Sequence, residues 1–299
     1  LKVGGLQGKT FRKILELFKL LFAAIPVSIL LRQKKINVIF TTGGYISAPS
    51  ILGAKLTGTP ILLHESNAIP GKATRLLGRF CDHVALGIPS ASEYLPRCKT
   101  SFTGTPVRAE FFVEQSLPSW APRGKGILIV VMGGSQGAKK LNEMVANVLP
   151  WLLKKGCRVV HLTGSNDFLF QKFEEVSNHP NLVVRHFSNE IPALLQNADL
   201  AISRAGAGAI SELMVTKTPS ILIPFPQSTD QHQDLNAAYM ASFGGAVIVN
   251  QNNPKEYILK DIISKFLTSD SLMKMKSNMN NHNFINAEKK LLEILNAII

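Results

Sequence analysis

Short apolar runs alternate with segments of helical period throughout the second half of the chain. The runs are continuous rather than alternating in polarity, which is typical of parallel strands that are covered on both faces. The segments between them repeat apolar residues every three or four positions, as amphipathic helices do. The pattern therefore predicts a parallel α/β sheet, with strands at residues 127–132, 159–163, 182–184, 200–203, 220–223 and 246–249.

The first half shows the same alternation after an opening helix. We predict that helix over residues 10–32, where apolar residues recur at three- and four-residue steps. Its apolar stretch, residues 20–31, is shorter than the roughly 20 residues that cross a bilayer, and Pro26 interrupts it. The apolar face either packs on the sheet or lies in a membrane interface, and it is wide enough to do both. Strands are predicted to follow at residues 38–41, 61–63, 84–86 and 100–102.

A proline-rich segment separates the two halves. Residues 104–126 contain Pro106, Pro118 and Pro122 and keep no period, so we place an interdomain linker within them. A chain of 299 residues is long enough for two α/β domains. We predict an N-terminal domain over residues 1–108, a linker over 109–125 and a C-terminal domain over 126–299, which closes with an amphipathic helix from residue 283.

Basic residues are concentrated in the first half. Residues 1–118 hold 15 Lys and Arg against 6 Asp and Glu, whereas the rest of the chain holds 18 against 14. This excess fits an anionic partner, such as a membrane face, a phosphorylated substrate or a nucleic acid, but also a merely solvated basic surface. No RNA- or DNA-binding motif accompanies the charge, so we predict no nucleic-acid partner. The three cysteines are far apart and indicate free thiols rather than a disulfide or a metal site.

Glycine-rich segments follow two of the predicted strands. Residues 133–138 (GGSQGA) follow the first strand of the second half, and residues 204–209 (RAGAGA) follow the fourth. A glycine loop that leads into a helix binds anions, because unpaired N–H groups and the helix dipole converge there. A polar segment, residues 230–237, follows the next strand, and ligands of parallel sheets lie at these strand ends. The three segments together predict one nucleotide-sized site, although residues 133–138 alone could form a tight turn without a ligand.

Taken together, these segments and several others resemble the MurG family of glycosyltransferases. The matching stretches occur in the family's order and extend over nearly the whole chain. Each is weak alone, but the set is specific. They are residues 42–45 (TGGY), 64–71 (HESNAIPG), 104–108 (GTPVR), 133–138, 204–207 (RAGA), 211–212 (SE) and 230–237.

The resemblance implies a GT-B fold, in which two Rossmann-like domains with parallel sheets face each other across a cleft. It also implies transfer of N-acetylglucosamine (GlcNAc) from UDP-GlcNAc to the 4-hydroxyl of the muramoyl sugar in lipid I, with inversion at the anomeric carbon. Lipid I is an undecaprenyl-linked precursor, and the product, lipid II, serves peptidoglycan synthesis. The family opens with a strand and a glycine-rich loop that carries a histidine. This sequence has no match to them, so we expect a first domain that lacks both.

Three residues are expected at the donor diphosphate and ribose. By resemblance, Ser135 holds the pyrophosphate, Arg108 adds a fixed positive charge beside it, and Glu212 accepts hydrogen bonds from the ribose hydroxyls. Arg108 has an alternative role in a salt bridge of the linker, and Glu212 has one as a charge that favours a helix N terminus. The sequence contains no Asp-x-Asp, the usual metal-binding motif of nucleotide-sugar enzymes, so we expect no metal or other cofactor.

Three further matches concern the donor's sugar and base. Gln233 matches the family's contact to the GlcNAc hydroxyls, and Asn67 matches a residue that faces the sugar from the first domain. Ser188 falls where the main chain of the family frames uracil. The resemblance therefore predicts that the second domain supplies most of the donor site.

Four residues of the first half are expected on the acceptor side. Gly43, Gly44 and Tyr45 would shape the acceptor pocket, with backbone N–H groups on the lipid pyrophosphate. His64 is a candidate general base, since the family's own candidate lies in the unmatched N-terminal loop. Its alternative is a buried, hydrogen-bonded histidine at a strand end. A general base contributes about 10²–10⁴-fold to a rate.

The opening helix is the expected membrane contact. Lys9, Arg12 and Lys13 would lie on anionic headgroups, with the ring of Phe18 in the apolar layer. The resemblance implies a peripheral protein on the cytoplasmic face of the bacterial plasma membrane, with UDP-GlcNAc, lipid I and the anionic surface as partners. Two alternatives stay open. One is a truncated UDP-sugar-binding paralogue without catalysis, and the other is a UDP-GlcNAc 2-epimerase, which shares the fold and needs no lipid.

Overall fold

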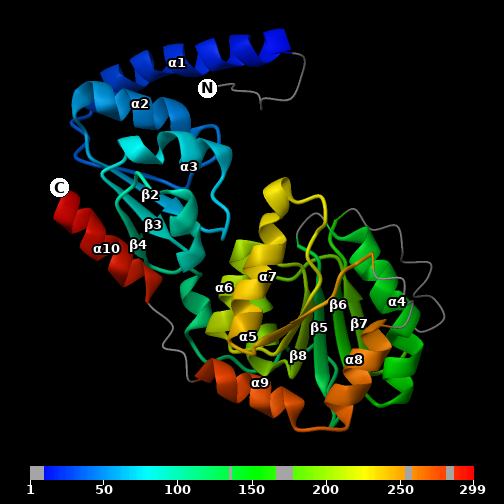
Figure 1. The fold of residues 1–299 in the computed structure, drawn as a ribbon. Coiled ribbons are helices and arrows are strands. Elements are labelled where there is room, and N and C mark those ends of the chain that lie inside the picture. Colours follow the sequence, from blue (N-terminus) through cyan, green and yellow to red (C-terminus); the bar gives the residue numbers. More distant parts are fainter. Residues whose placement is uncertain (1–9, 135–136, 166–177, 253–257, 281–285) are drawn as a thin grey trace. The chain divides into compact units, whose positions relative to one another are not determined.

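The computed structural model describes residues 10–134, 137–165, 178–252, 258–280 and 286–299, with the backbone alone for residues 10–19 and 21. The chain folds into two compact units (Figure 1). One comprises residues 1–106 and 285–299, and the other comprises residues 107–284. Each unit is built on a parallel sheet, as the apolar pattern predicts.

The first unit contains a four-stranded sheet with the order β1-β2-β3-β4. All neighbouring strands are parallel. The strands agree with the sequence-based positions to within two residues: β1 (Ile39–Thr41), β2 (Ile61–Glu65), β3 (His83–Leu86) and β4 (Thr100–Phe102). The helical elements are α1 (Thr10–Gln33), α2 (Ser47–Thr57), α3 (Lys72–Leu77), α10 (Ala287–Ile298) and the 3-10 helices η1 (Gly78–Phe80) and η2 (Pro89–Tyr94).

A glycine lets α1 and α2 approach closely. A Cβ on Gly53 of α2 would lie 2.8 Å from Cγ1 of Val27 and 2.9 Å from the carbonyl oxygen of Ala24, so a larger residue would push the helices apart. Leu20 and Ala24 are buried, and Leu31 joins the core that also contains residues of β2 and β3. One face of α1 therefore packs on α2, and Leu31 extends this contact to the core of the sheet.

Another side of α1 leaves large apolar side chains in solvent. Phe22, Ile25, Ile29 and Leu30 are about half exposed or more, and the exposed fraction of Phe22 is 67%. The spacing of the first three places them on one face of the helix. We call these four residues the exposed face of α1. Among the described residues, no helix is long and apolar enough to span a membrane.

The C-terminal helix lies in the first unit, whereas the sequence-based boundaries place it in the second domain. Leu291 of α10 packs on Leu62 of β2 and Ala85 of β3. These strand residues alternate with Leu63 and Val84, which belong to the core beneath α2, and successive strand residues point to opposite faces of a sheet. Helix α10 thus covers the second face of the first sheet. Amphipathicity shows that a helix has an apolar partner but not which one, so the sequence could not reveal this.

The second unit contains a six-stranded sheet with the order β10-β9-β8-β5-β6-β7, in which all neighbours are parallel. The chain builds from β5 to β7 and then returns to the other side of β5 with β8. The junction of β5 and β8 is therefore the switch point of the sheet, where a crevice forms at the carboxyl ends of the strands.

All six strands of the second unit lie within one residue of the predicted positions: β5 (Leu128–Met132), β6 (Arg158–Leu162), β7 (Leu182–Arg185), β8 (Leu200–Ser203), β9 (Ser220–Leu222) and β10 (Ala246–Ile248). The helical elements are η3 (Ala109–Phe111), α4 (Lys139–Lys154), α5 (Ile191–Asn197), α6 (Ala207–Val215), η5 (Thr229–Gln231), α7 (His232–Ser242), α8 (Ile258–Leu267) and α9 (Ser271–Asn280).

Alternate residues of β5 contribute to two cores. Ile129 and Val131 join a cluster with residues of α4 and α8, whereas Leu128 and Val130 join one with residues of α5, α6 and α7. All four are fully buried. A continuous apolar run is what a strand needs when helices cover both faces of its sheet.

The predicted linker is packed into the second unit. Phe111 and Leu117 are buried in one of its cores. The side chain of Gln196 accepts from the amide of Gln115 at 2.9 Å and donates to the carbonyls of Phe111 (3.1 Å) and Val113 (2.9 Å). Prolines remove the periodicity of a segment without preventing its burial. The sequence therefore predicts an irregular segment here but does not show that this segment packs against the second unit.

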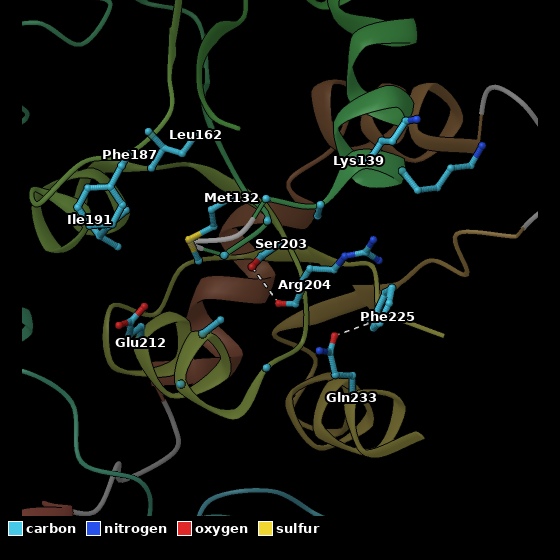
Figure 2. A pocket seen from close by; sticks show the side chains of 18 of the residues that line it. Met132, Lys139, Leu162, Phe187, Ile191, Ser203, Arg204, Glu212, Phe225 and Gln233 are labelled. Atoms are coloured by element: carbon cyan, nitrogen blue, oxygen red, sulfur yellow. Dashed lines mark hydrogen bonds between the residues drawn. The ribbon is translucent and has the colours of Figure 1, made fainter. Parts of the chain in front are cut away.

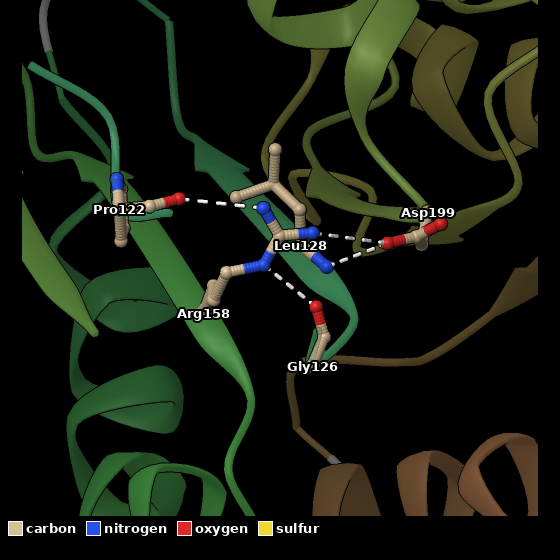
Figure 3. Close-up of polar contacts among 5 residues, drawn as sticks. All are labelled: Pro122, Gly126, Leu128, Arg158 and Asp199. Atoms are coloured by element: carbon tan, nitrogen blue, oxygen red, sulfur yellow. Dashed lines mark hydrogen bonds and ion pairs between the residues drawn. The ribbon is translucent and has the colours of Figure 1, made fainter. Parts of the chain in front are cut away.

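Arg158 and Asp199 connect three segments at the amino end of the second sheet (Figure 3). Arg158 Nε donates to the carbonyl of Gly126 at 2.6 Å, and Nη1 donates to that of Pro122 at 3.3 Å. Arg158 Nη2 lies 3.9 Å from Asp199 Oδ2, which also accepts the N–H of Leu128 at 2.7 Å. The pair therefore attaches the segment before β5 to the starts of β6 and β8.

Replacing Asp199 with alanine is expected to destabilise the second unit. The N–H of the fully buried Leu128 would lose its acceptor, which costs about 1–3 kcal/mol of unfolding free energy. Trp120 and Trp151 both lie in this unit, so denaturation followed by tryptophan fluorescence measures its stability. Asp199→Asn keeps an acceptor oxygen and is the control. Equal losses in both variants would contradict this role of the carboxylate.

Candidate functional site

A cavity of about 990 Å³ opens at the carboxyl end of the second sheet (Figure 2). Residues at or beyond the ends of all six strands line it, on both sides of the switch point between β5 and β8. Its size is that of a site for a small organic ligand. Four of the sequence-predicted residues line it together: Arg108, Ser188, Glu212 and Gln233.

The glycine-rich segment after β5 forms one wall of this cavity. Gly134 has a φ of +89° and Gly137 one of +82°, a region that side chains disfavour. A Cβ on Gly137 would also lie 2.7 Å from the carbonyl oxygen of Thr163. Helix α4 starts directly after its N-cap residue, Ala138. The side chain of Ala138 makes no hydrogen bond to the first N–H groups of the helix. The first N–H groups of a helix without a side-chain cap are suited to an anion.

Arg204 places a buried positive charge at the switch point, directly after β8. Its Nη1 donates to the carbonyls of Ile223 (2.9 Å) and Pro224 (3.1 Å), and its Cζ lies 5.5 Å from the centre of the Phe225 ring. Burial lowers the pKa of the guanidinium. Arg204 forms no ion pair with the residues that the structure describes. A cation in the lining without a carboxylate partner favours an anionic ligand.

Glu212 and Arg108 contribute opposite charges to the same cavity. Glu212 is half-buried in the second turn of α6, and burial raises the pKa of its carboxyl while the charge of Arg108 lowers it in part. Because Glu212 lies beyond the first turn, the helix-dipole alternative does not account for it. Arg108 is exposed and contacts the ring of Phe111, with Cζ 5.5 Å from its centre. Among the described residues Arg108 forms no salt bridge, so the linker alternative finds no support either.

A further wall of the cavity is apolar. Phe187 and Ile191 both line it (Figure 2), and the exposed fraction of Phe187 is 61%. Ser188 follows Phe187, and its Oγ accepts the N–H of Glu190 at 3.0 Å. This hydroxyl is therefore engaged in the turn before α5, which agrees with a ligand contact through the main chain of Ser188. An exposed aromatic ring in the wall of a cavity suits a flat ligand group.

Gln233 lies in the first turn of α7, across the cavity from the apolar wall. Its Oε1 accepts the N–H of Phe225 at 2.9 Å, which leaves the side-chain amide nitrogen as a donor for a ligand. The turn that precedes α7 is unusual, because Asp230 (φ +53°) and Gln231 (φ +56°) both have left-handed conformations. This backbone places Gln233 at the cavity, while Nδ1 of His232 donates to the carbonyl of Thr229.

In the first unit, His64 is a buried residue of β2. Its Nε2 lies 3.0 Å from the carbonyl oxygen of Gly104, so this nitrogen carries the proton, and its Nδ1 lies 3.3 Å from the hydroxyl of Ser66. Burial lowers the pKa of His64, although Gly104 and Glu65 oppose that shift. With both nitrogens engaged, the geometry favours the structural interpretation of His64 over the general base.

Glu65 organises the loop that carries Asn67. Its Oε1 accepts from the backbone and side-chain nitrogens of Asn67 at 3.1 and 3.3 Å. Its Oε2 accepts from the N–H of Gly71 at 3.0 Å and from the hydroxyl of Thr74 at 2.9 Å. The carboxylate is 6% exposed and binds four donors, so it fixes the position of Asn67. No pattern in the sequence indicates this role for Glu65.

Gly43, Gly44 and Tyr45 form the turn between β1 and α2. The two glycines have φ values of +80° and +76°, which explains why this turn uses glycine twice. Ser47 Oγ donates to the carbonyl of Gly44 at 2.6 Å and closes the turn. Tyr45 is 40% exposed and is therefore accessible to a ligand.

Five predicted site residues lie outside what the structure describes. Ser135 and Lys9 are not among the described residues, and the side chains of Arg12, Lys13 and Phe18 are not described. Their roles stay predictions from the sequence. Within the described part of the chain, no cluster of three or more His, Cys, Asp or Glu could hold a metal ion.

Two family descriptions match the sequence. That of the glycosyltransferase family 28 C-terminal domain matches residues 128–292, more than half of the chain, and that of the family 28 N-terminal domain matches residues 1–86. The chain belongs to glycosyltransferase family 28. The family 28 C-terminal domain contains the whole sheet of the second unit and most of its cavity.

Curated relatives place the chain more narrowly within family 28. A UDP-N-acetylglucosamine–N-acetylmuramyl-(pentapeptide) pyrophosphoryl-undecaprenol N-acetylglucosamine transferase from Prochlorococcus marinus (strain NATL2A) is 74% identical over 298 residues, which is 100% of this chain and 85% of the relative. A protein of the same name from Synechococcus sp. (strain CC9605) is 51% identical and covers 99% of this chain and 84% of its own length. The resemblance predicted from the motifs is confirmed.

Solved structures of low sequence identity share the family 28 fold. Acinetobacter baumannii MurG superposes with a TM-score of 0.77 at 23% identity, over 99% of this chain and 84% of that one. A UDP-GlcNAc 2-epimerase from Neisseria meningitidis gives a TM-score of 0.60 at 14% identity, over 91% and 80%. These likenesses confirm the predicted α/β fold of two Rossmann-like domains. Since a transferase and an epimerase share that fold, it does not by itself identify the reaction.

Proposed function

We propose that this chain transfers GlcNAc from UDP-GlcNAc to the 4-hydroxyl of the muramoyl sugar of undecaprenyl-linked lipid I and so forms lipid II. The observation that carries the proposal is the cavity at the switch point of the family 28 C-terminal domain, which gathers Arg108, Ser188, Glu212 and Gln233. The name of the relative that is 74% identical over the whole chain supplies the substrates.

The lining of the cavity can hold each part of the donor. Phe187 and the main chain of Ser188 would hold uracil, and the carboxylate of Glu212 would accept from the ribose hydroxyls. The diphosphate would lie at the glycine-rich segment and the N terminus of α4, where Arg108 adds a positive charge. The side-chain amide of Gln233 would then donate to the sugar. In this assignment the groups of the cavity follow the order base, ribose, phosphate and sugar.

The reaction in this arrangement is a single displacement. The 4-oxygen of the acceptor forms a bond to the anomeric carbon of GlcNAc while the bond from that carbon to the phosphate oxygen breaks. UDP leaves with the bonding electron pair, and the 4-hydroxyl releases its proton. The configuration changes from α to β because attack comes from the face opposite UDP. The main electrostatic task is to stabilise the negative charge that develops on UDP. Arg108, Arg204 and the N terminus of α4 contribute positive potential for this task.

Incubation with UDP-GlcNAc, with and without a lipid I analogue, tests the proposal. We expect UDP release and formation of a β-linked disaccharide that both depend on the acceptor. Formation of the 2-epimer of UDP-GlcNAc without acceptor would instead establish the epimerase. UDP binding without any turnover would establish the non-catalytic binding protein, and either result would reject the transferase.

We also propose that the exposed face of α1 lies in the cytoplasmic surface of the plasma membrane. Phe22, Ile25, Ile29 and Leu30 expose apolar surface that would otherwise stay in water. Arg32, Lys34 and Lys35 follow directly and can contact anionic headgroups. The lipid substrate carries an undecaprenyl chain, so an enzyme that acts on it gains from residence at the membrane.

The variant Phe22→Ser/Ile25→Ser is expected to bind anionic vesicles at least tenfold more weakly, because each apolar side chain contributes about 1.5–3 kcal/mol when buried. Co-sedimentation with phosphatidylglycerol-containing vesicles measures this binding. Leu292→Ser is the matched control, since Leu292 is 59% exposed but lies on α10, which covers the other face of the same sheet. A comparable loss in the control would contradict the assignment to α1.

A further inference from the structure

Two fully buried polar side chains join α4 to β6 behind the cavity. Asn142 lies in the first turns of α4 and His161 in β6, and both are 0% exposed. Asn142 Nδ2 donates to the carbonyl of Thr163 at 3.0 Å, and Asn142 Oδ1 lies 3.0 Å from His161 Nε2. Because the Thr163 carbonyl can only accept, Asn142 Oδ1 must face His161, and His161 Nε2 must carry the proton.

This arrangement does not depend on pH in the range where enzymes work. Burial lowers the pKa of His161 to about 3, so the imidazole stays neutral and keeps the proton that its bond to Asn142 requires. The link between α4 and β6 therefore does not change with pH in this range.

The carbonyl oxygen of Thr163 also lies close to the glycine-rich segment. A Cβ on Gly137 would lie 2.7 Å from this oxygen, so Gly137 and Asn142 both rest against the same atom. The N–H of Asn142 bonds the carbonyl of Ala138 at 2.9 Å, which joins the start of α4 to the end of that segment. One carbonyl oxygen at the end of β6 therefore contacts both the glycine-rich segment and the first turn of α4.

Packing alone does not call for polar groups at this position. Neighbours of Asn142 on α4, such as Leu141 and Val145, lie in an apolar core, and burial of an amide and an imidazole there carries a desolvation cost. Two buried polar side chains that bond each other in an apolar core instead select one arrangement of the elements that they join. Both elements line the cavity, and the start of α4 lies at the place assigned to the donor diphosphate.

We propose that Asn142 and His161 are positioning residues of the transferase. They hold Gly137 and the first turn of α4 where the donor diphosphate binds, and they do so without contacting the substrate. This inference rests on the proposed function, because it concerns the diphosphate of UDP-GlcNAc. It predicts that loss of the pair weakens binding of the donor's phosphates and leaves binding of its nucleoside unchanged.

The test compares UDP with uridine as ligands of the purified full chain. In Asn142→Leu we expect calorimetry to show UDP binding weakened by about ten- to a hundredfold, the scale that follows from small misplacements of binding groups, while uridine binding changes less than about twofold. The kcat for UDP-GlcNAc is expected to fall as well. His161→Gln, whose amide can still donate to Asn142, is expected to retain most of both.

Thr218→Val is the matched control for a purely structural loss. Thr218 is 1% exposed, donates to the carbonyl of Leu195 at 2.8 Å and does not line the cavity. This variant should lower the melting temperature but leave the ratio of UDP to uridine affinity unchanged. If Asn142→Leu unfolds, Asn142→Leu/His161→Leu serves in its place, since it leaves neither side chain with a lost partner.

The outcomes separate the two proposals. A folded Asn142 variant with an unchanged affinity ratio and kcat overturns the positioning role, and so does an equal loss of UDP and uridine binding. A wild-type chain that binds no UDP rejects the proposed function itself. A loss of affinity for UDP but not for uridine in the Asn142 variant supports both proposals.

Discussion

Glu212→Gln is expected to weaken UDP binding by roughly 10- to 150-fold, since a hydrogen bond to a charged group contributes about 1.5–3 kcal/mol. Glutamine keeps the shape of the side chain but offers a neutral acceptor to the ribose hydroxyls. Calorimetric titration with UDP measures the effect, and Glu114→Gln, an exposed carboxylate outside the cavity, is the control. Unchanged affinity in Glu212→Gln would remove this residue from the donor site.

The same variant is expected to be more stable than the wild type when no ligand is bound. The folded-state pKa of Glu212 lies above its ordinary value because burial disfavours the carboxylate. The stabilisation from the protonated form is therefore complete below the ordinary pKa and is lost as the pH rises through the raised one. At neutral pH the ionised side chain opposes folding, so Glu212→Gln should raise the melting temperature at pH 7. The difference should shrink as the pH falls below the ordinary pKa of a glutamate.

Gly137→Ala is expected to disturb both the stability and the donor site. The alanine would have a φ of +82°, which costs about 1–2 kcal/mol, and its Cβ would press on the Thr163 carbonyl, which adds about 1–3 kcal/mol. The backbone must move to relieve this contact, so we expect transfer to slow by about a hundredfold. Thermal unfolding and initial rates with UDP-GlcNAc measure the two effects.

Gly156→Ala separates conformational strain from the close contact. Gly156 has a φ of +77°, but a Cβ there would meet nothing within 4 Å, and the residue does not line the cavity. The free energy of unfolding of this variant should fall by only about 1–2 kcal/mol, and its transfer rate should stay unchanged. If Gly137→Ala were as active as Gly156→Ala, the shape of the glycine-rich segment would not matter for the donor.

The positions of the strands along the chain and the edge at which the site lies could both be predicted from the sequence. Short continuous apolar runs such as residues 200–203 are typical of strands that are covered on both faces, and they end where polar and glycine-rich loops begin. Parallel strands bring those loops to one edge. That is why Arg108, Ser188, Glu212 and Gln233, scattered over more than a hundred residues, line one cavity.

What the sequence left open depends on contacts between distant segments. The role of His64 turned on Gly104, forty positions away, whose carbonyl fixes the proton on Nε2. Phe187 gave no signal, because one exposed aromatic residue in a loop has no periodicity. Arg204 belongs to the RAGA motif, but its burial, without an acidic partner among the described residues, shows only in three dimensions. Local patterns identify elements and loops, whereas charge balance and proton positions need the neighbours.

The packing of α10 on Leu62 and Ala85 has a consequence for folding during synthesis. The strands of the first sheet leave the ribosome early, but the helix that shields their second face is encoded nearly 200 residues later. At translation speeds of 5–20 residues per second, that surface stays uncovered for roughly 10–40 s. The nascent chain is therefore a natural client for chaperones that bind apolar surface, and the first sheet is covered on both faces only after α10 has been made.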